Sequence, residues 1–197
     1  MFIPNWSPFD IICSFLILEP TLSVSNSSLV EDKKVTSKTR NDIIKILQMK
    51  GLPYELTDLI LDYAEYWITN CHVNSTYISG ENLNYLYIQT NLIKDLTRCM
   101  KIVVEISSHD QGWATGPGSF TWTEFAIVHL DGTEERWEAY RNDRGQIESK
   151  VRTFEMTRQL SCIQQFTKLD SFAVWIRSQY PGWSNHVDYC KLELYYK

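Results

Sequence analysis

The chain of 197 residues has no apolar run long enough to cross a membrane and no cluster of basic residues. Its N-terminal apolar stretch, residues 11–18, is far shorter than the ~20 residues that a membrane-spanning helix requires. No run of Lys or Arg is longer than the pair Lys33 and Lys34, and the formal net charge is −5. Because nucleic acids and anionic membrane surfaces are bound through basic side chains, we expect neither a nucleic acid partner nor a membrane span.

The cysteines are few, and none of them forms a CxxC pair. Five cysteines leave one over in any complete set of disulfides, which is typical of reduced thiols in a cytoplasmic or nuclear protein. The four histidines show no HxxxH spacing, and no phosphate-binding glycine motif is present. We therefore expect cytoplasmic or nuclear localisation, no metal and no cofactor.

A helical hairpin is predicted early in the chain. Asn41 or Asp42 is expected to cap its first helix, and Gly51 to end it. In the second helix, which Leu52 and Pro53 open, apolar residues recur with the spacing i, i+3, i+4, i+7 and i+11, and acidic residues take the other side. We expect the hairpin to bury this stripe, which consists of Leu56, Leu59, Ile60, Tyr63 and Trp67.

The hydrophobic period changes to two from Lys101 onward, which is typical of β-strands. Asp131 and Gly132 form the strongest hairpin signal in the chain, and no helical pattern separates successive strands. An antiparallel β-sandwich of jelly-roll type is therefore favoured over an α/β sheet. The expected strands cover residues 101–107, 120–130, 134–140, 151–157, 172–179 and 187–196.

The predicted fold class is thus α+β, with three parts. Residues 1–40 form an apolar N-terminal segment and a polar linker, and residues 41–70 form the helical hairpin. Residues 69–80 are expected to be rich in turns, and residues 83–197 to form the β-sandwich.

Two loops with tryptophan stand between predicted strands, in the segments SSHDQGWATGPGSFTWTE and YPGWSNH. Since loops gather at the two ends of a sandwich, we expect these two loops to share one end. They are either structural locks, in which amides and buried indoles satisfy one another, or a ligand mouth with aromatic faces and orienting polar groups. The candidate binding residues are Ser108, His109, Asp110, Gln111, Trp113, Trp122, Trp183 and Asn185.

Catalysis has little support in these residues. Nucleophilic catalysis needs a nucleophile beside a base that a third group orients. His109 with Cys162 or Cys190 is conceivable, but no local motif supports such a pair. We therefore expect a protein that is not an enzyme.

Three motifs carry a resemblance to known proteins: LPYELTDLILDYAEYW, SSHDQGW…FTWTEF and YPGWSNHV, in this order. Together they resemble a family of fungal proteins of uncharacterised function, from Leu52 to the C-terminus. The resemblance implies no activity.

The opening of the second helix also resembles an F-box. The resemblance implies docking on the Skp1 adaptor of a ubiquitin ligase, followed by a galactose-binding-like sandwich that holds a client. The chain departs from the F-box pattern after Trp67, where polar turns replace further helices. The alternative is a hairpin that covers one face of the sandwich. The residues that would dock are Leu52, Pro53, Leu56, Leu59, Ile60 and Trp67.

The sequence as a whole favours a non-enzymatic interaction module. Loops at one end of the sandwich would bind a protein or a glycan. The alternatives are an F-box-type adaptor for a ubiquitin ligase and a hydrolase that uses His109.

Overall fold

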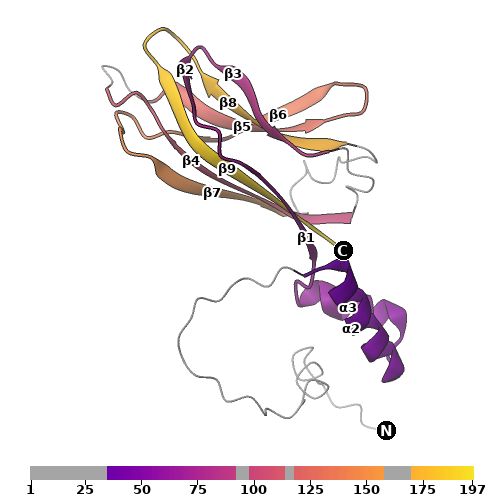
Figure 1. The fold of residues 1–197 in the computed structure, drawn as a ribbon. Coiled ribbons are helices and arrows are strands. Elements are labelled where there is room, and N and C mark those ends of the chain that lie inside the picture. The colour runs from indigo at the N-terminus through magenta and orange to yellow at the C-terminus, as the bar shows by residue number, and fades with distance from the viewer. Residues whose placement is uncertain (1–34, 92–97, 114–117, 158–169) are drawn as a thin grey trace, which may run out of the picture. The chain divides into compact units, whose positions relative to one another are not determined.

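The computed structural model describes residues 35–91, 98–113, 118–157 and 170–197 (Figure 1). The chain divides into two compact units, residues 1–68 and residues 69–197. Most of the predicted N-terminal segment and linker lies outside the described residues. The first unit contributes two described helices, and the second contributes two antiparallel sheets.

The helical hairpin consists of α2 (Ser37–Met49) and α3 (Tyr54–Tyr63). The predicted cap at Asn41 or Asp42 is wrong, because Thr36 caps α2 and its hydroxyl accepts a hydrogen bond from the Thr39 amide at 3.1 Å. Threonine is a favourable capping residue, and the earlier start brings Arg40 into the helix. The sequence pattern missed it because this first turn is polar.

Arg40 holds the two helices together. Its guanidinium donates to the Asp58 carboxylate at 2.6 Å, lies 3.4 Å from Asp62, and donates to the carbonyl of Tyr66 at 2.7 Å. Arg40 is buried in spite of its charge. An ion-pair cluster therefore helps to close the hairpin.

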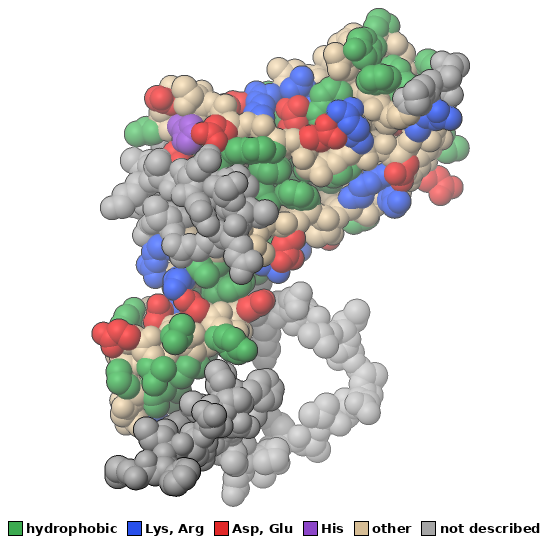
Figure 2. Space-filling model, turned by 180° about the vertical axis from the view of Figure 1, so that it is seen from behind, with side chains coloured by type: hydrophobic (Ala, Val, Ile, Leu, Met, Phe, Trp, Pro, Cys, Tyr) green, Lys and Arg blue, Asp and Glu red, His purple; other side chains and the backbone are tan. Residues whose placement is uncertain are grey.

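The predicted burial of the apolar stripe of α3 is wrong. Thr57 and Leu61 are the buried residues of α3, whereas Leu59 is 63% exposed and Tyr63 is 70% exposed. Leu56 is exposed as well, Ile60 is half-buried, and Trp67 lies beyond the end of the helix. The helix packs through its face with Thr57 and Leu61, so much of the predicted stripe is exposed. Hydrophobic side chains are visible on the surface of the helical unit (Figure 2).

The second unit is a jelly roll of two packed sheets. One sheet has the order β1-β9-β4-β7, with β2 also paired to β9, and the other has the order β3-β8-β5-β6. From β2 onward the chain alternates between the sheets except at the β5-β6 hairpin, which is the pattern of a jelly roll. The strands are β1 (Ile68–Asn74), β2 (Ile78–Glu81), β3 (Asn84–Gln89), β4 (Cys99–His109), β5 (Thr121–Val128), β6 (Glu134–Arg141), β7 (Lys150–Thr157), β8 (Ser171–Ser178) and β9 (Ser184–Tyr196).

The structure confirms the α+β class and the strands predicted beyond Lys101. It also confirms the hairpin turn at Asp131 and Gly132, where Gly132 has a φ of +82°. The turn-rich prediction for residues 69–80 is wrong, because β1 and β2 occupy most of that range. Their sequences are polar and short, so they lack the alternation by which the later strands are recognised.

The sandwich core lies between the sheets, where alternate residues of β4, β5, β8 and β9 point inward. The ring of Phe125 stacks on those of Trp137, Phe154 and Phe172, with centroids 5.2–5.8 Å apart. These inward residues fix the register of both sheets, and thereby the positions of the loops at each end. None of the helices in the described part of the chain is long and apolar enough to span a membrane.

Candidate recognition site at one end of the sandwich

Three loops meet at one end of the sandwich: residues 110–113 and 118–120 after β4, residues 142–149 after β6 and residues 179–183 after β8. Each presents one large apolar side chain to solvent. Trp113 is 55% exposed, Ile147 is 70% exposed and Tyr180 is 50% exposed. We call these three residues the loop patch.

Two glycines let the three loops approach one another closely. A Cβ atom at Gly112 would collide with Cγ2 of Ile147, and one at Gly182 would stand 2.9 Å from Cη2 of Trp113. Both glycines have φ near +85°, a conformation that other residues rarely adopt. The expected proximity of the two tryptophan loops is confirmed, because Trp113 lies against the loop that carries Trp183.

Aromatic rings support the patch from below. Phe120 packs edge-to-face on Tyr180, with centroids 5.0 Å apart, and on Trp183, with centroids 5.1 Å apart. Trp183 is half-buried in this cluster. It therefore supports Tyr180 rather than presenting a free indole face.

Asp110 joins two of the loops. It is fully buried, and its two carboxylate oxygens accept hydrogen bonds from the amides of Gly112 and Gly145, both at 2.8 Å. The first bond closes an Asx-type turn, and the second ties the turn to the β6-β7 loop. Because both oxygens have partners, Asp110 serves as a structural anchor.

A buried amide network continues beneath the loops. The Ser108 hydroxyl donates to Oδ1 of Asn142 at 2.8 Å, and Nδ2 of Asn142 donates to Oδ1 of Asn185 at 2.9 Å. Nδ2 of Asn185 donates in turn to the carbonyls of Trp122 and Arg177, at 3.1 and 2.9 Å. Ser108 and Asn185 are therefore committed to internal bonds, as the lock interpretation expects.

Two histidines stack beside this network, at the paired ends of β4 and β9. The rings of His109 and His186 have centroids 4.4 Å apart and planes within 5° of parallel. Nδ1 of His109 donates to the carbonyl of Asp110 at 2.6 Å, and Nδ1 of His186 shares a hydrogen bond of 2.8 Å with the Tyr77 hydroxyl. In stacked rings the in-plane lone pairs run side by side, so the two rings cannot converge on one metal ion.

The two remaining predicted residues are Gln111 and Trp122, of which only Trp122 lies apart from this end of the sandwich. Gln111 is half-buried and donates to the carbonyl of Trp113. Trp122 is buried on the outer face of β5, where its indole N–H donates to Glu124 at 2.7 Å and the Arg141 guanidinium lies over its ring. The structure thus brings His109, Asp110, Gln111, Trp113, Trp183 and Asn185 to one end of the sandwich, whereas Trp122 belongs to a sheet face.

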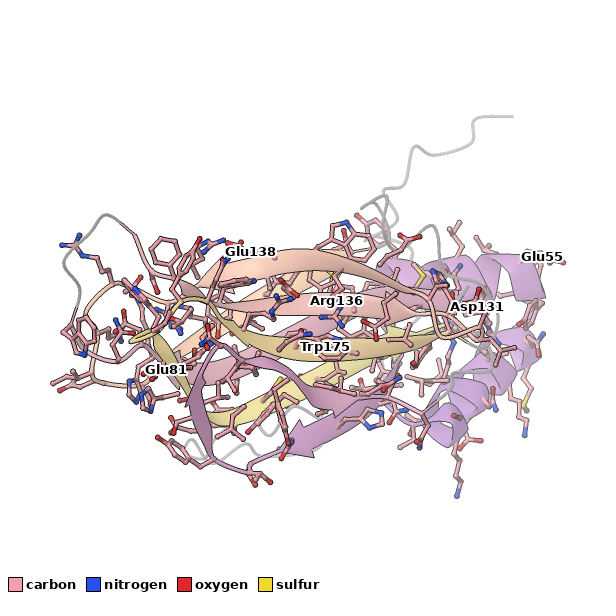
Figure 3. The ribbon with its side chains drawn as sticks, turned by 90° about the horizontal axis from the view of Figure 1, so that it is seen from above. Glu55, Glu81, Asp131, Arg136, Glu138 and Trp175 are labelled. Atoms are coloured by element: carbon pink, nitrogen blue, oxygen red, sulfur yellow. The ribbon has the colours of Figure 1, made fainter. Side chains whose placement is uncertain are left out.

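The outer face of the β3-β8-β5-β6 sheet carries a second arginine–tryptophan pair. The Arg136 guanidinium carbon lies 3.6 Å from the centroid of the Trp175 ring, and both side chains lie on this face (Figure 3). Arg177 pairs with Glu124 at 2.9 Å on the same face. These tryptophan faces are covered by cations of the protein itself, so this surface offers no bare aromatic platform.

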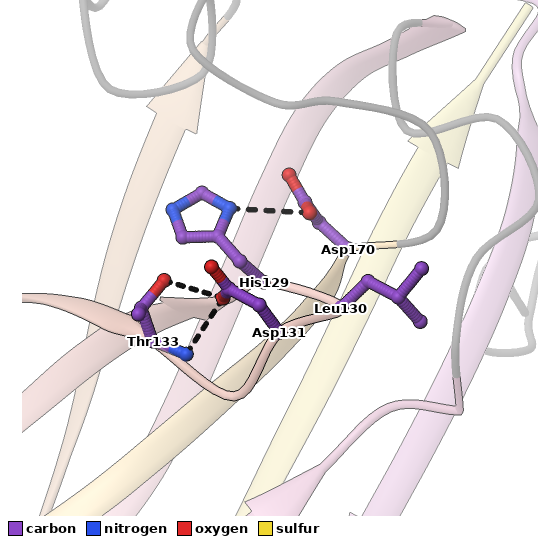
Figure 4. Close-up of a pocket in the computed structure, with 5 residues that line it drawn as sticks. All are labelled: His129, Leu130, Asp131, Thr133 and Asp170. Atoms are coloured by element: carbon purple, nitrogen blue, oxygen red, sulfur yellow. Dashed lines mark hydrogen bonds and ion pairs between the residues drawn. The ribbon is translucent and has the colours of Figure 1, made fainter.

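The opposite end of the sandwich holds an open hollow of about 600 Å³ beside the β5-β6 hairpin (Figure 4). His129 lies within 3.2 Å of the buried Asp170 and within 3.6 Å of Glu135. Burial opposes protonation here, but the hydrogen bonds and charges of Asp170 and then Glu135 outweigh it and raise the pKa of His129. In the described ranges, no group of three or more His, Cys, Asp or Glu side chains is placed to hold a metal ion.

The cysteines of the described residues offer no support for the hydrolase alternative. Cys190 lies in the core, and burial raises the pKa of its thiol to about 12. It is paired across the sheet with Ile106 rather than with His109. Cys162 lies outside the described residues.

Sequence reasoning missed two of the three patch residues. Ile147 stands alone in a polar loop, and Tyr180 precedes the Pro-Gly turn of the β8-β9 loop. A single apolar residue surrounded by polar and turn-forming residues has no periodicity, so only its unusual context could have marked it. The chemistry available at this end is therefore mainly apolar contact, because Ser108, Asp110, Asn142 and Asn185 are bonded within the protein.

Comparisons with known proteins add only distant likenesses. No family model matches the sequence, and no curated protein matches it. Among solved structures, the VP2 subviral particle of infectious bursal disease virus is similar with a TM-score of 0.44 and 11% identity, over 65% of this chain and 33% of that chain. Dimeric latent PorU from Porphyromonas gingivalis is similar with a TM-score of 0.36 and 7% identity, over 66% of this chain and 13% of that chain. The chain thus spans about a third or less of each of these two proteins, and its function has to be inferred from its own residues.

Proposed function

We propose that the protein is a non-enzymatic interaction module that binds a protein partner through the loop patch. One observation supports this most strongly: three loops, which approach one another at Gly112 and Gly182, expose Trp113, Ile147 and Tyr180. Tryptophan and tyrosine dominate the energetics of protein interfaces. The anchors at Asp110, Asn142 and Asn185 hold the loops in place, so binding costs little ordering entropy.

A protein partner is favoured over a glycan by the state of the polar side chains. A glycan site needs polar groups free to bind sugar hydroxyls beside an aromatic face. Ser108, Asp110 and Asn185 are buried and bonded within the protein. Ile147 also adds an aliphatic contact, which suits an apolar side chain of a protein.

Comparative affinity purification from the native cell tests the proposal. We expect a partner that the wild type recovers to be lost with the double change Trp113→Ala and Ile147→Ser. The matched control is Leu130→Ser, since Leu130 is exposed in the β5-β6 hairpin at the other end of the sandwich. The variants change exposed side chains, so each should keep the thermal stability of the wild type.

Equal recovery by the wild type and the double variant would contradict the proposal. Binding of the purified protein to a glycan array, lost with Trp113→Ala, would replace the protein partner with a glycan. Unfolding of the double variant would identify the patch as part of the core.

A second candidate function is an adaptor that docks through α3, as the F-box resemblance implies. The observation that favours it is the exposed stripe of Leu56, Leu59 and Tyr63. An apolar helical stripe with this spacing is a common docking face for a partner helix. α3 contains Glu55 in its first turn and no basic residue, so the surroundings of this apolar face are acidic.

A pull-down with purified Skp1 tests the adaptor function. We expect Leu56→Ser with Leu59→Ser to abolish binding, and Lys45→Ser on α2 to leave it unchanged. No binding of Skp1 by the wild type would end this candidate and leave the loop-patch proposal untouched.

A further inference from the structure

The stacked histidines connect the two strand ends from which the Trp113 and Tyr180 loops extend. His109 is the last residue of β4, and Trp113 follows in the same loop. His186 lies near the start of β9, just after the loop with Tyr180 and Trp183. The two residues are also directly paired across the sheet. Any change in the stack therefore acts on both loops at once.

We propose that the His109–His186 stack makes the loop patch pH-sensitive, holding its loops together when the His186 ring is neutral and loosening them when that ring is protonated. This inference concerns the regulation of the proposed recognition site. It depends on that function only for its biological consequence, because the stack can be studied in the free protein.

The groups that face the two rings are a hydroxyl, a carbonyl and two carboxylates that are hydrogen-bonded elsewhere. Tyr77 faces His186 through its hydroxyl, and the Asp110 carbonyl faces His109. The Asp110 carboxylate is bonded to two backbone amides, and the Asp188 carboxylate accepts a hydrogen bond from Ser107 at 2.8 Å. Both carboxylates are thus engaged elsewhere, and neither forms an ion pair with a ring in the described structure.

Protonation is disfavoured in the stacked arrangement. Burial, followed by the charge of His109, lowers the pKa of His186, while Asp110 and Asp188 act in the opposite direction. A proton consequently binds more strongly to a separated His186 ring than to the stacked one. By linkage, acid shifts the equilibrium toward the separated rings.

Amide hydrogen exchange of the free full-length protein tests the inference. The probes are the Gly112 amide, which is bonded to Asp110, and the Trp183 amide, which is bonded to the Tyr180 carbonyl. After correction for the intrinsic exchange rate, we expect their protection to fall between about pH 7.5 and about pH 5, because the separated His186 ring binds the proton more strongly. Histidine NMR signals recorded over the same range should show His186 titrating below its ordinary value of 6.5.

Matched variants separate the stack from other titrating groups. His186→Phe keeps a ring in the stack without a titrating nitrogen, so protection of both amides should no longer depend on pH. His109→Phe makes the same test from the other strand. His129→Gln, at the opposite end of the sandwich, should respond like the wild type.

Two results would overturn the inference: unchanged protection in the wild type across this pH range, or a wild-type response in both phenylalanine variants. Failure of the recognition proposal is distinguishable from either result. The double change Trp113→Ala and Ile147→Ser removes the loop patch but leaves the stack, so its amides should keep the pH response.

Discussion

At the scale of single residues, buried polar side chains fix the loops at both ends of the sandwich. Asp110 binds two backbone amides at the patch end, and Asp170 binds His129 at the other end. Charged hydrogen bonds in buried positions contribute more than neutral ones and are costly to break. Each of these anchors therefore has a measurable effect on stability.

Replacement of Asp110 by alanine is expected to destabilise the sandwich by about 3 kcal/mol or more, because two bonds to a charged acceptor are lost. Urea unfolding of the wild type and the variant measures the difference. Asp143→Ala is the control, since the Asp143 side chain is 57% exposed and forms ion pairs with Lys150 and Arg152 rather than buried bonds to backbone amides. That change should cost less than about 1 kcal/mol, and an equal loss for the two variants would contradict the anchor role.

The His129 pair predicts a pH-dependent contribution to stability. Because the pKa of His129 is raised above its ordinary value of 6.5, the pair stabilises the fold fully below that value. The contribution is lost as the pH rises through the raised pKa. The drop in melting temperature on His129→Gln should thus be larger at about pH 5.5 than at about pH 8.5, and a drop independent of pH would refute this.

At the scale of elements, the helical hairpin depends on Arg40. The change Arg40→Met leaves Asp58 and Asp62 without their buried cation, which typically costs about 3–5 kcal/mol. We expect peptides that cover α2 and α3 to lose protection in hydrogen exchange. Lys45→Met is the matched control, because Lys45 is exposed on α2. Unchanged protection in Arg40→Met would show that apolar contacts alone close the hairpin.

Gly112 is a second element-scale test, because it sets the distance between two loops. Alanine there would meet Ile147 and adopt an unfavourable positive φ. We expect a loss of about 1–3 kcal/mol, together with a change in the exposure of Trp113. Gly132→Ala is the control, since it has a similar φ but nothing within 4 Å of its added Cβ. A smaller loss at Gly112 than at Gly132 would contradict close loop packing.

At the scale of the whole molecule, the chain divides into two compact units, residues 1–68 and residues 69–197. β1 begins at Ile68, and the sheets are complete within residues 68–197. We expect a chain that begins at Tyr66 to fold into the sandwich with the melting temperature of the sandwich transition in the full chain. Calorimetry measures this, and failure of the shortened chain to unfold cooperatively would contradict two independent units.

The sequence predicted the sandwich better than the hairpin, and the reason is physical. Strands such as β4 and β9 alternate between core and solvent, so period two identifies both the element and its buried face. In α3 the same kind of reasoning identified the helix but predicted the wrong buried face. The helix is buried at Thr57 and pairs with Arg40 through Asp58. Ion pairs between distant residues have no periodic signature.

For the proposed recognition site as well, the sequence predicted one feature and missed another. The meeting of the two tryptophan loops follows from the sandwich topology, and was predicted. The separation of anchors from exposed residues was not predicted, because Asp110 and Trp113 lie in one loop and the sequence does not show that Asp110 reaches the amides of Gly112 and Gly145. Such differences depend on three-dimensional contacts with Gly145 and Gly182.

The exposure of Trp113 has an optical consequence. An indole in water fluoresces at longer wavelength than one in an apolar environment, and small dissolved quenchers reach it more easily. A bound partner that covers Trp113 would therefore shift the emission toward the blue and shield it from quenching. The protein carries its own reporter at the surface where recognition is proposed.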